Sequence, residues 1–368
     1  MSIKLTIGSA VYNLDESFLR EHIEGIAKQL NSNTELLLID DCSTDNSGEV
    51  CREYAEKHDN VRYINMEKNS GLSAVRNRTV EEAAGEWVFF ADGDNLLSDH
   101  FVETALEFID ETQDIIILER LKFVKNKPAE QPCVVSELNP LPDGAGIELS
   151  MSCLCLDKTI TEKLCLPSRA FYHAAWGALY RKRFLTDNNL LFPVGQKKAQ
   201  DSVFNTKAYY YAKRIAYLPY VMYYYRNNPG GITRRYSENL SEVFAMLIGH
   251  FEECIETFYH GNTDVEKRYK NNRIMAMAID YMRLNVFHKD NPKPKSQRKE
   301  DFLRFIDSEP YKSAIADFDA DVSDRREWLL AASLLKGKKF AILGLLMRNE
   351  KIFYKSSAVY RIFRKNNS

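Results

Sequence analysis

The chain has 368 residues, of which 45% are hydrophobic and 28% are charged, and its formal net charge is −2 at pH 7. This length allows a sizeable core and more than one domain, and the composition is ordinary for a globular protein. The near-zero charge excludes a global electrostatic attraction to nucleic acid, and no apolar run reaches the roughly 20 residues of a membrane-spanning helix.

Strand and helix patterns alternate through the first hundred residues. Short apolar runs predict strands, whereas apolar residues at helical spacing, with capping residues at their ends, predict helices. The expected elements are a strand over 5–12, a helix over 17–29, a strand over 35–39, a helix ending near 58, a strand over 61–64, a helix over 72–84 and a strand over 87–91. This alternation predicts a mostly parallel sheet with helices on both faces.

The pattern changes after residue 100. The expected elements are a helix over 101–110, a strand over 115–119, a proline-rich loop over 125–146, a helix over 202–211 and a pair of strands over 214–226 that is broken at Pro219. Beyond about residue 237, long helical patterns over 240–258 and 269–287 and a charged linker over 289–299 predict a separate helical domain.

The seven cysteines are odd in number, and none of them has C-x-x-C spacing. This usage disfavours the common zinc modules and predicts reduced thiols in a cytosolic protein. The first residues pass directly into a strand pattern, without the basic and apolar regions of a signal peptide. Both observations predict a cytoplasmic protein.

Two carboxylates one residue apart, Asp92 and Asp94, directly follow the apolar run 87–91. In open α/β sheets, ligands bind beyond the carboxyl ends of the strands. Carboxylate oxygens are the ligands that Mg²⁺ and Mn²⁺ prefer, and Mg²⁺ is usually shared with a substrate phosphate. Position and chemistry therefore predict a divalent-cation site. The alternative is a solvated turn around Gly93.

Polar residues also follow the second strand and open the third helix. Asp41 ends the strand over 35–39 and can accept hydrogen bonds from a nucleobase or a ribose, although a helix-capping loop explains it as well. Arg76 lies near the start of the helix over 72–84, where a helix N-terminus and an arginine together attract phosphate. A plain surface charge is the alternative for Arg76.

Several strings of residues occur in order and at a familiar spacing. Four of them fall within about 95 residues, at 11–13, 38–45, 69–77 and 89–94, and three more follow at 176–182, 200–204 and 224–233. Together they resemble the family 2 glycosyltransferases, which have the GT-A fold, use nucleotide-sugar donors and invert the configuration of the sugar. The resemblance implies an α/β GT-A domain over residues 1–236, followed here by a helical domain over 237–368.

The resemblance also implies a mechanism. A hydroxyl of a glycan or lipid-linked acceptor displaces the diphosphate of the donor, which is expected to be a UDP-sugar. Asp94, with Asp92 beside it, is expected to hold Mn²⁺ or Mg²⁺, and the ion neutralises the leaving group. Asp201 is expected to be the general base. Arg76 and Arg226 are expected to add positive charge at the diphosphate.

The remaining site residues come from the same resemblance. Tyr12, next to Asn13, is expected to stack on the nucleobase, Asp41 to read the edge of that base, and Gly93 to lie in the nucleotide site. Trp176 is expected on the acceptor side, stacked on a sugar ring, and a buried core tryptophan is the alternative.

Three positions depart from the family pattern. Ala10 replaces a usual proline, Asn95 a frequent third acid, and Gln200 the usual glutamate before Asp201. Because Gln200 removes a charge beside the expected base, a second hypothesis stays open, a catalytically silent scaffold that binds a nucleotide sugar. A nucleotidyltransferase is disfavoured, since residues 8–12 do not form a glycine-rich basic loop.

The last 34 residues alternate Lys and Arg with apolar side chains, and Glu350 is their only acid. Basic amphipathic helices bind anionic membrane surfaces. The tail therefore predicts a cytoplasmic enzyme held on the inner face of the membrane, with a solvated basic face as the alternative. The resemblance implies a role in bacterial surface polysaccharide, capsule or cell-wall synthesis. The helical domain is a candidate for homo-oligomer contacts.

Overall fold

The computed structural model describes residues 2–124, 127–128, 137–157, 159–227, 235–323 and 328–348. The chain forms two compact units. The first comprises Met1–Ser150 and Ile160–Asn228, and the second comprises Met151–Thr159 and Pro229–Ser368. The short segment Met151–Thr159 thus belongs to the second unit although it interrupts the first in sequence.

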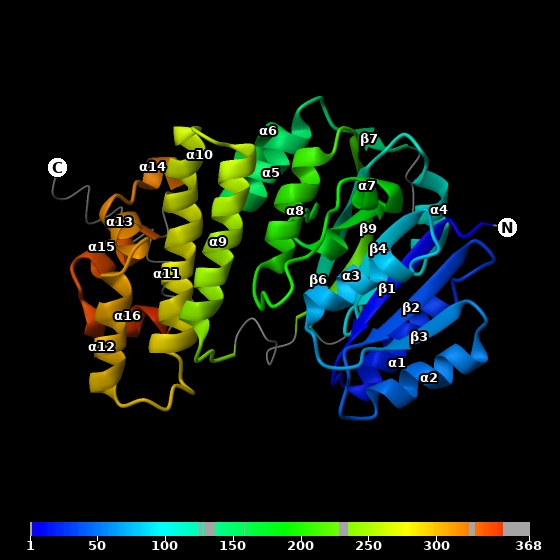
Figure 1. The fold of residues 1–368 in the computed structure, drawn as a ribbon, viewed down its shortest axis with the longest axis horizontal. Coiled ribbons are helices and arrows are strands. Elements are labelled where there is room, and N and C mark those ends of the chain that lie inside the picture. Colours follow the sequence, from blue (N-terminus) through cyan, green and yellow to red (C-terminus); the bar gives the residue numbers. More distant parts are fainter. Residues whose placement is uncertain are drawn as a thin grey trace. The chain divides into compact units, whose positions relative to one another are not determined.

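The first unit is built on one sheet (Figure 1). Its strands, among the described residues, are β1 (Leu5–Val11), β2 (Thr34–Asp40), β3 (Val61–Asn65), β4 (Trp87–Asp92), β5 (Leu96–Leu97), β6 (Ile115–Phe123), β7 (Asn139–Pro140), β8 (Ala178–Arg181) and β9 (Ile215–Arg226). The order across the sheet is β3-β2-β1-β4-β8-β6-β9-β5, and β7 pairs with β9. Strands β3, β2, β1 and β4 are parallel, whereas β5, β7 and β8 are antiparallel to their neighbours.

Helices lie in most of the connections between these strands. They are α1 (Glu16–Ala27), α2 (Ser47–Lys57), α3 (Leu72–Glu82), α4 (Phe101–Phe108), α5 (Ala145–Cys155), α6 (Thr159–Lys163), the 3₁₀ turn Ala175–Gly177, α7 (Lys182–Asp187) and α8 (Gln200–Tyr211). Alternate residues of β2 point to opposite faces of the sheet. Leu36 and Leu38 belong to the large core that includes α1 and α2, whereas Leu37 and Ile39 pack with Val75 of α3. Both faces of β2 are therefore covered, which explains its continuous apolar sequence.

The predicted α/β fold is confirmed, with a mixed sheet, and most elements of the first hundred residues lie within three residues of their predicted bounds. The prediction of two strands over 214–226 is wrong, because β9 runs through Pro219 without a break. The pairing of β9 with β6 shifts register between Ile117 and Glu119, so the proline, which lacks an N–H, lies at an irregularity of the ladder. Helix α5 was not predicted.

The second unit is helical throughout its described residues. Its elements after Thr159 are α9 (Leu240–Phe258), α10 (Thr263–Arg268), a π-helical turn (Tyr269–Ile274), α11 (Met275–Tyr281), a second π-helical turn (Met282–Val286), α12 (Lys295–Ile306), α13 (Tyr311–Ala316), α14 (Ala320–Ser323), α15 (Leu329–Lys336) and α16 (Phe340–Met347). In α9, the buried residues Leu240, Phe244, Leu247, Phe251 and Cys254 recur every three or four positions and form one apolar face.

The predicted helices over 240–258 and 269–287 are confirmed, and the predicted linker is shorter because α12 already begins at Lys295. None of the helices in the described ranges combines the length and apolar character needed to cross a bilayer. The basic tail beyond Arg348 and the segment 230–233 lie outside the described residues.

Candidate active site

Three parallel strands bring the predicted nucleotide and metal residues to one edge of the sheet. In the register of the ladders, Val11 lies opposite Asp40, and Ala10 lies opposite Asp92. The residues that follow these strands, including Tyr12 and Asp41, therefore lie at the same carboxyl edge, which is the edge where open α/β sheets bind ligands.

The loops after β1 and β2 are tied together by Asn13. This residue has a left-handed backbone conformation with φ of 45°. Its backbone N–H donates to Ser43 Oγ at 3.0 Å, and its side-chain oxygen accepts from the backbone N–H of Thr44 at 2.8 Å. The neighbouring Tyr12 is 46% exposed, so its ring has a free surface. Stacking of this ring on a nucleobase stays a prediction.

Asp41 is buried and supports the loop before α3. Its two carboxylate oxygens accept the backbone N–H groups of Ser70 at 2.7 Å and Gly71 at 2.8 Å. Gly71 has a φ of 85°, a conformation that favours glycine. The structure thus gives Asp41 a positioning task at the first turn of α3. Its contact with a nucleobase stays a prediction.

The Asp-Gly-Asp turn closes tightly against β1. A Cβ atom on Gly93 would lie 3.0 Å from the carbonyl oxygen of Ala10 and 2.7 Å from a methyl carbon of Leu14, so a larger residue would push the turn outward. Asn95 Nδ2 donates to Asp94 Oδ1 at 2.9 Å. The amide at the position of the usual third acid therefore holds one oxygen of the Asp94 carboxylate.

Arg226 clamps the same turn from β9. Its backbone N–H donates to Asn95 Oδ1 at 2.8 Å, its Nε donates to the carbonyl oxygen of Asp94 at 2.9 Å, and its Nη2 donates to Glu21 Oε2 at 2.6 Å. The guanidinium is buried over the ring of Phe18. The expectation that Arg226 faces a diphosphate does not fit these contacts, because they use the side chain to hold the turn.

His22 of α1 supports the turn from below and was not predicted. Its Nδ1 lies 2.6 Å from the carbonyl oxygen of Asn95, and its Nε2 lies 2.8 Å from Ser9 Oγ. Burial lowers the pKa of His22 to about 4, so the ring is neutral at pH 7. In the sequence, His22 stands next to Ile23 on the apolar face of the helix, and a polar residue on such a face is the signal that could have revealed it.

Arg76 joins two acids that are far apart in the sequence. Its Nη2 donates to Asp92 Oδ1 at 3.0 Å, and its Nη1 donates to Asp201 Oδ1 of α8. Asp201 Oδ2 also accepts the backbone N–H of Ala175 at 3.2 Å. The Arg76 side chain is 3% exposed. The predicted base and the predicted metal residue are thus neighbours, and the arginine expected at the diphosphate is engaged by both carboxylates.

Burial disfavours the ionised forms of Asp92 and Asp94. Burial raises the pKa of Asp92, the charge of Arg76 opposes this shift, and the charge of Asp201 adds to it. Burial and the negative charge of Asp92 raise the pKa of Asp94 to about 6. Carboxylates shifted in this way gather at functional sites.

A divalent cation fits the donor set of Asp92 and Asp94, because its charge would relieve the repulsion between these two carboxylates. Within the described ranges, no group of three or more His, Cys, Asp or Glu side chains is arranged to hold a metal ion. An ion at this turn would therefore need further oxygen ligands, and substrate phosphates commonly supply them to Mg²⁺.

Trp176 lies in the core, not on an open sugar-binding surface. It is 5% exposed, and its ring stacks on those of Phe171 and Tyr223 with centroid separations of 5.0 and 4.6 Å. A ring so enclosed cannot stack on a pyranose, so the expected contact with an acceptor sugar does not fit the structure. Instead, Trp176 packs behind Tyr223, whose hydroxyl accepts the backbone N–H of Asp92 at 3.4 Å.

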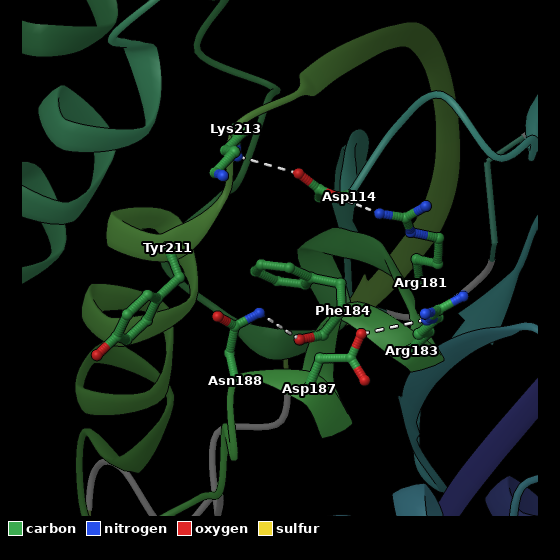
Figure 2. Close-up of a pocket in the computed structure, with 8 residues that line it drawn as sticks. All are labelled: Asp114, Arg181, Arg183, Phe184, Asp187, Asn188, Tyr211 and Lys213. Carbon is green, nitrogen blue, oxygen red and sulfur yellow. Dashed lines mark hydrogen bonds and ion pairs between the residues drawn. The ribbon is translucent and has the colours of Figure 1, made fainter.

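A pocket of about 320 Å³ opens at the opposite edge of the sheet (Figure 2). It is lined by Asp114, Arg181, Arg183, Phe184, Asp187, Asn188, Tyr211 and Lys213. None of the predicted site residues lines it. Asp114 precedes β6 and Arg181 ends β8, which pairs with the first residue of β4. The pocket therefore lies at the amino ends of β4 and β6 and at the carboxyl end of the antiparallel strand β8, away from Asp92.

The chain is similar to a glycosyltransferase family and to individual glycosyltransferases. Residues 6–184 match the family model described as "Glycosyl transferase family 2". The poly(ribitol-phosphate) beta-N-acetylglucosaminyltransferase TarS of Staphylococcus aureus (strain MW2) is 28% identical over 339 residues, which are 90% of this chain and 52% of TarS. The glycosyltransferase GlyA of Streptococcus pneumoniae is 30% identical over 236 residues, 64% of this chain and 32% of GlyA. The chain thus spans about half the length of TarS.

A similar fold is found among solved structures. The crystal structure of S. aureus TarS 1–349 in complex with UDP-GlcNAc superposes with a TM-score of 0.60 at 22% sequence identity. The match covers 94% of this chain and 90% of that chain. At this identity the likeness shows the fold alone.

Proposed function

Since this chain belongs to the family 2 glycosyltransferases through its N-terminal GT-A domain, we propose that it transfers a sugar from a UDP-sugar to a hydroxyl of a bacterial cell-wall polymer. The observation that carries this proposal is the meeting of Asp92 and Asp201 on Arg76 at the carboxyl edge of the sheet. This arrangement supports a metal site at the Asp92–Asp94 turn, beside a carboxylate that would act as the base.

Two curated relatives support a phosphate-containing acceptor. S. aureus TarS is named a poly(ribitol-phosphate) beta-N-acetylglucosaminyltransferase, and a relative from Bacillus spizizenii, 27% identical over 284 residues, is named a poly(ribitol-phosphate) beta-glucosyltransferase. Both names combine one kind of acceptor with different sugars. We therefore propose a polyol-phosphate polymer as the acceptor class. The donor sugar is either glucose or a derivative such as N-acetylglucosamine.

The residues of the site suit a single displacement with inversion. Asp201 would take the proton of the acceptor hydroxyl, and Arg76 and the N–H of Ala175 fix the two oxygens of its carboxylate. Such positioned base catalysis typically contributes roughly 10²–10⁴-fold to the rate. Asp94 and Asp92 would hold Mn²⁺ or Mg²⁺, which would stabilise the charge of the departing diphosphate.

We also propose that the basic tail of the second unit contacts the membrane surface. The basic composition of the last 34 residues supports a peripheral contact with anionic lipid at the inner face of the membrane, near the growing polymer. Contacts between copies of the chain through the helical unit stay a prediction.

The proposal is tested by measuring UDP release from a panel of UDP-sugars with Mn²⁺ and a ribitol-phosphate oligomer. The full chain is expected to turn over one of these donors. Asp201→Asn should lower turnover by at least about 100-fold and retain UDP binding, because it removes only the base. Asp187→Asn, which changes an exposed acid paired with Arg183 at the opposite edge, is the matched control and should keep full activity.

The result that would contradict the enzyme hypothesis is equally specific. If the chain binds UDP or a UDP-sugar by calorimetry, but no donor in the panel yields UDP above the Asp201→Asn background, the silent scaffold is the better description.

A further inference from the structure

The shielded arginines of the first unit are paired with acids. Arg76 contacts Asp92 and Asp201, Arg226 contacts Glu21, and Arg181 contacts Asp114. Such pairing is the rule, because a guanidinium removed from water needs compensation.

Arg120 of β6 departs from this rule. In the part of the chain that the structure describes, its guanidinium has neither an ion pair nor a hydrogen bond, and its contacts are aromatic. Its Cζ lies 3.6 Å from the ring centroid of Phe171, 5.7 Å from that of Trp176 and 6.0 Å from that of Tyr225. Burial against these rings lowers the pKa of Arg120 below its ordinary value.

The aromatic cluster fixes the guanidinium and leaves its donors unused. A cation over a ring face gains electrostatic stabilisation without spending its N–H groups. Arginine presents five N–H donors in a planar fork that matches the geometry of a phosphate. Arg120 and Phe171 are both partly exposed, so this fork can be reached from solvent.

Arg120 is linked to the site through two short paths. In the ladder it lies opposite Tyr223, whose hydroxyl contacts the backbone of Asp92. Its ring partner Trp176 directly follows Ala175, whose N–H donates to Asp201. Arg120 is therefore placed near the predicted base.

The order of the strands places Arg120 away from the nucleotide side. The loops that carry Tyr12 and Asp41 follow β1 and β2, on one side of β4 in the sheet. Strand β6, which carries Arg120, lies on the other side of β4, beyond β8. A ligand of Arg120 would thus approach Asp201 from the side opposite the nucleoside.

We propose that Arg120 binds a phosphate of the acceptor polymer and so sets which hydroxyl reaches Asp201. This inference rests on the proposed transferase function and adds a recognition residue to it. Its central claim is that the acceptor is read by its anionic backbone, at a site distinct from that of the donor diphosphate.

The test compares a charged with a neutral acceptor. For Arg120→Gln, the KM for a ribitol-phosphate oligomer should rise about 10- to 100-fold, as expected for the loss of a bidentate charged contact. The KM for free ribitol at matched hydroxyl concentration, and the Kd for UDP measured by calorimetry, should stay within about twofold. Arg120→Lys keeps the charge without the fork and should fall between the two.

Arg169→Gln is the matched control, because Arg169 pairs with Glu119, the residue before Arg120, and is half exposed. It should leave the KM for the oligomer unchanged. A distorted site would raise the KM for ribitol as much as that for the oligomer, and this outcome would overturn the proposal. A weaker affinity for UDP would reassign Arg120 to the donor and overturn it as well.

Direct binding separates this inference from the proposed function. Titration of the UDP-bound chain with the oligomer should show a Kd that weakens about 10-fold or more in Arg120→Gln, whether or not transfer occurs. Binding through Arg120 without turnover would refute the transferase and keep the acceptor site. Turnover with an unchanged oligomer affinity in the variant would do the reverse.

Discussion

The two edges of the sheet in the first unit carry the same types of residue, aspartate and arginine, in different roles. At the amino edge, Asp114 Oδ2 accepts the backbone N–H groups of Lys213 at 3.0 Å and Arg214 at 3.1 Å. Its Oδ1 accepts from Arg181 Nη2, and Figure 2 shows the contacts with Lys213 and Arg181. Both of its oxygens are engaged, and the pair joins the start of β6 to the end of β8. This acid is a structural link.

At the carboxyl edge, the carboxylates of Asp92 and Asp94 have fewer hydrogen-bond partners. Asp92 and Asp201 share one guanidinium, and Asp94 receives a side-chain hydrogen bond from Asn95 on Oδ1. Burial raises the pKa of Asp92 and Asp94, which means that their ionised forms cost free energy in the folded chain. The comparison makes Asp92 and Asp94 candidate functional acids, since a bound cation and a substrate would supply the partners that these carboxylates lack.

The strongest way to break this comparison is to neutralise one acid at each edge. Asp114→Asn should lower the free energy of unfolding by about 3 kcal/mol. It removes the negative charge that pairs with Arg181, and it places a side-chain amide against backbone N–H donors. Asp94→Asn should leave stability equal or higher, because it removes an ionised group that burial disfavours. Its sugar transfer should fall by about 100-fold or more.

Urea denaturation and UDP release measure the two quantities on the same preparations. Asp114→Asn, assayed well below its unfolding temperature, should keep the activity of the unchanged chain. Equal losses of stability in both variants would show that the two edges do not differ in the way proposed.

The pH dependence of stability sharpens the comparison further. The pKa of Asp94 is raised to about 6. Its stabilising contribution to the free energy of unfolding is therefore fully present below the ordinary pKa of 3.8 and is lost as the pH rises through about 6. The pKa of His22 is lowered to about 4, so its contribution is present above 6.5 and is lost as the pH falls through about 4. Each amounts to about 3 kcal/mol, with opposite slope.

These two slopes offset each other in the unchanged chain between about pH 4 and 6.5. In Asp94→Asn only the slope of His22 remains, so the free energy of unfolding in metal-free buffer should fall more steeply on acidification than in the unchanged chain. Other titrating groups are common to both proteins and cancel in the difference. Parallel profiles for the two proteins would contradict the raised pKa of Asp94.

Sequence reasoning reached the carboxyl edge because its signals are local. The apolar run of β4 and the two acids after it stand within eight residues, and the alternation of strands and helices follows from short-range periodicity. The pairing of Arg76 with Asp201 spans 125 positions, and no local pattern reports it.

The errors of the sequence reasoning have the same origin. The burial of Trp176 depends on Phe171 and Tyr223, which come from two other segments, and the passage of β9 through Pro219 depends on the register of β6. The contact of Arg226 with Glu21, 205 residues away on the first helix, also has no local signal in the sequence, and the expected contact of Arg226 with a diphosphate stays a prediction. At these positions the sequence shows the type of residue, but it does not show which distant residues that residue contacts.

The smallest predicted effect concerns Tyr12, which stands at the carboxyl edge and is 46% exposed. Tyr12→Ala should change the free energy of unfolding by less than about 0.5 kcal/mol, because Tyr12 is an exposed residue at the end of β1. Loss of a stacked base should weaken UDP binding about tenfold, whereas Tyr12→Phe keeps the ring and should bind UDP as before. Calorimetry with UDP distinguishes these cases. An unchanged affinity in Tyr12→Ala would mean that the nucleobase lies away from β1, and that an exposed tyrosine is a weaker indicator of a nucleotide site than the raised pKa values of Asp92 and Asp94.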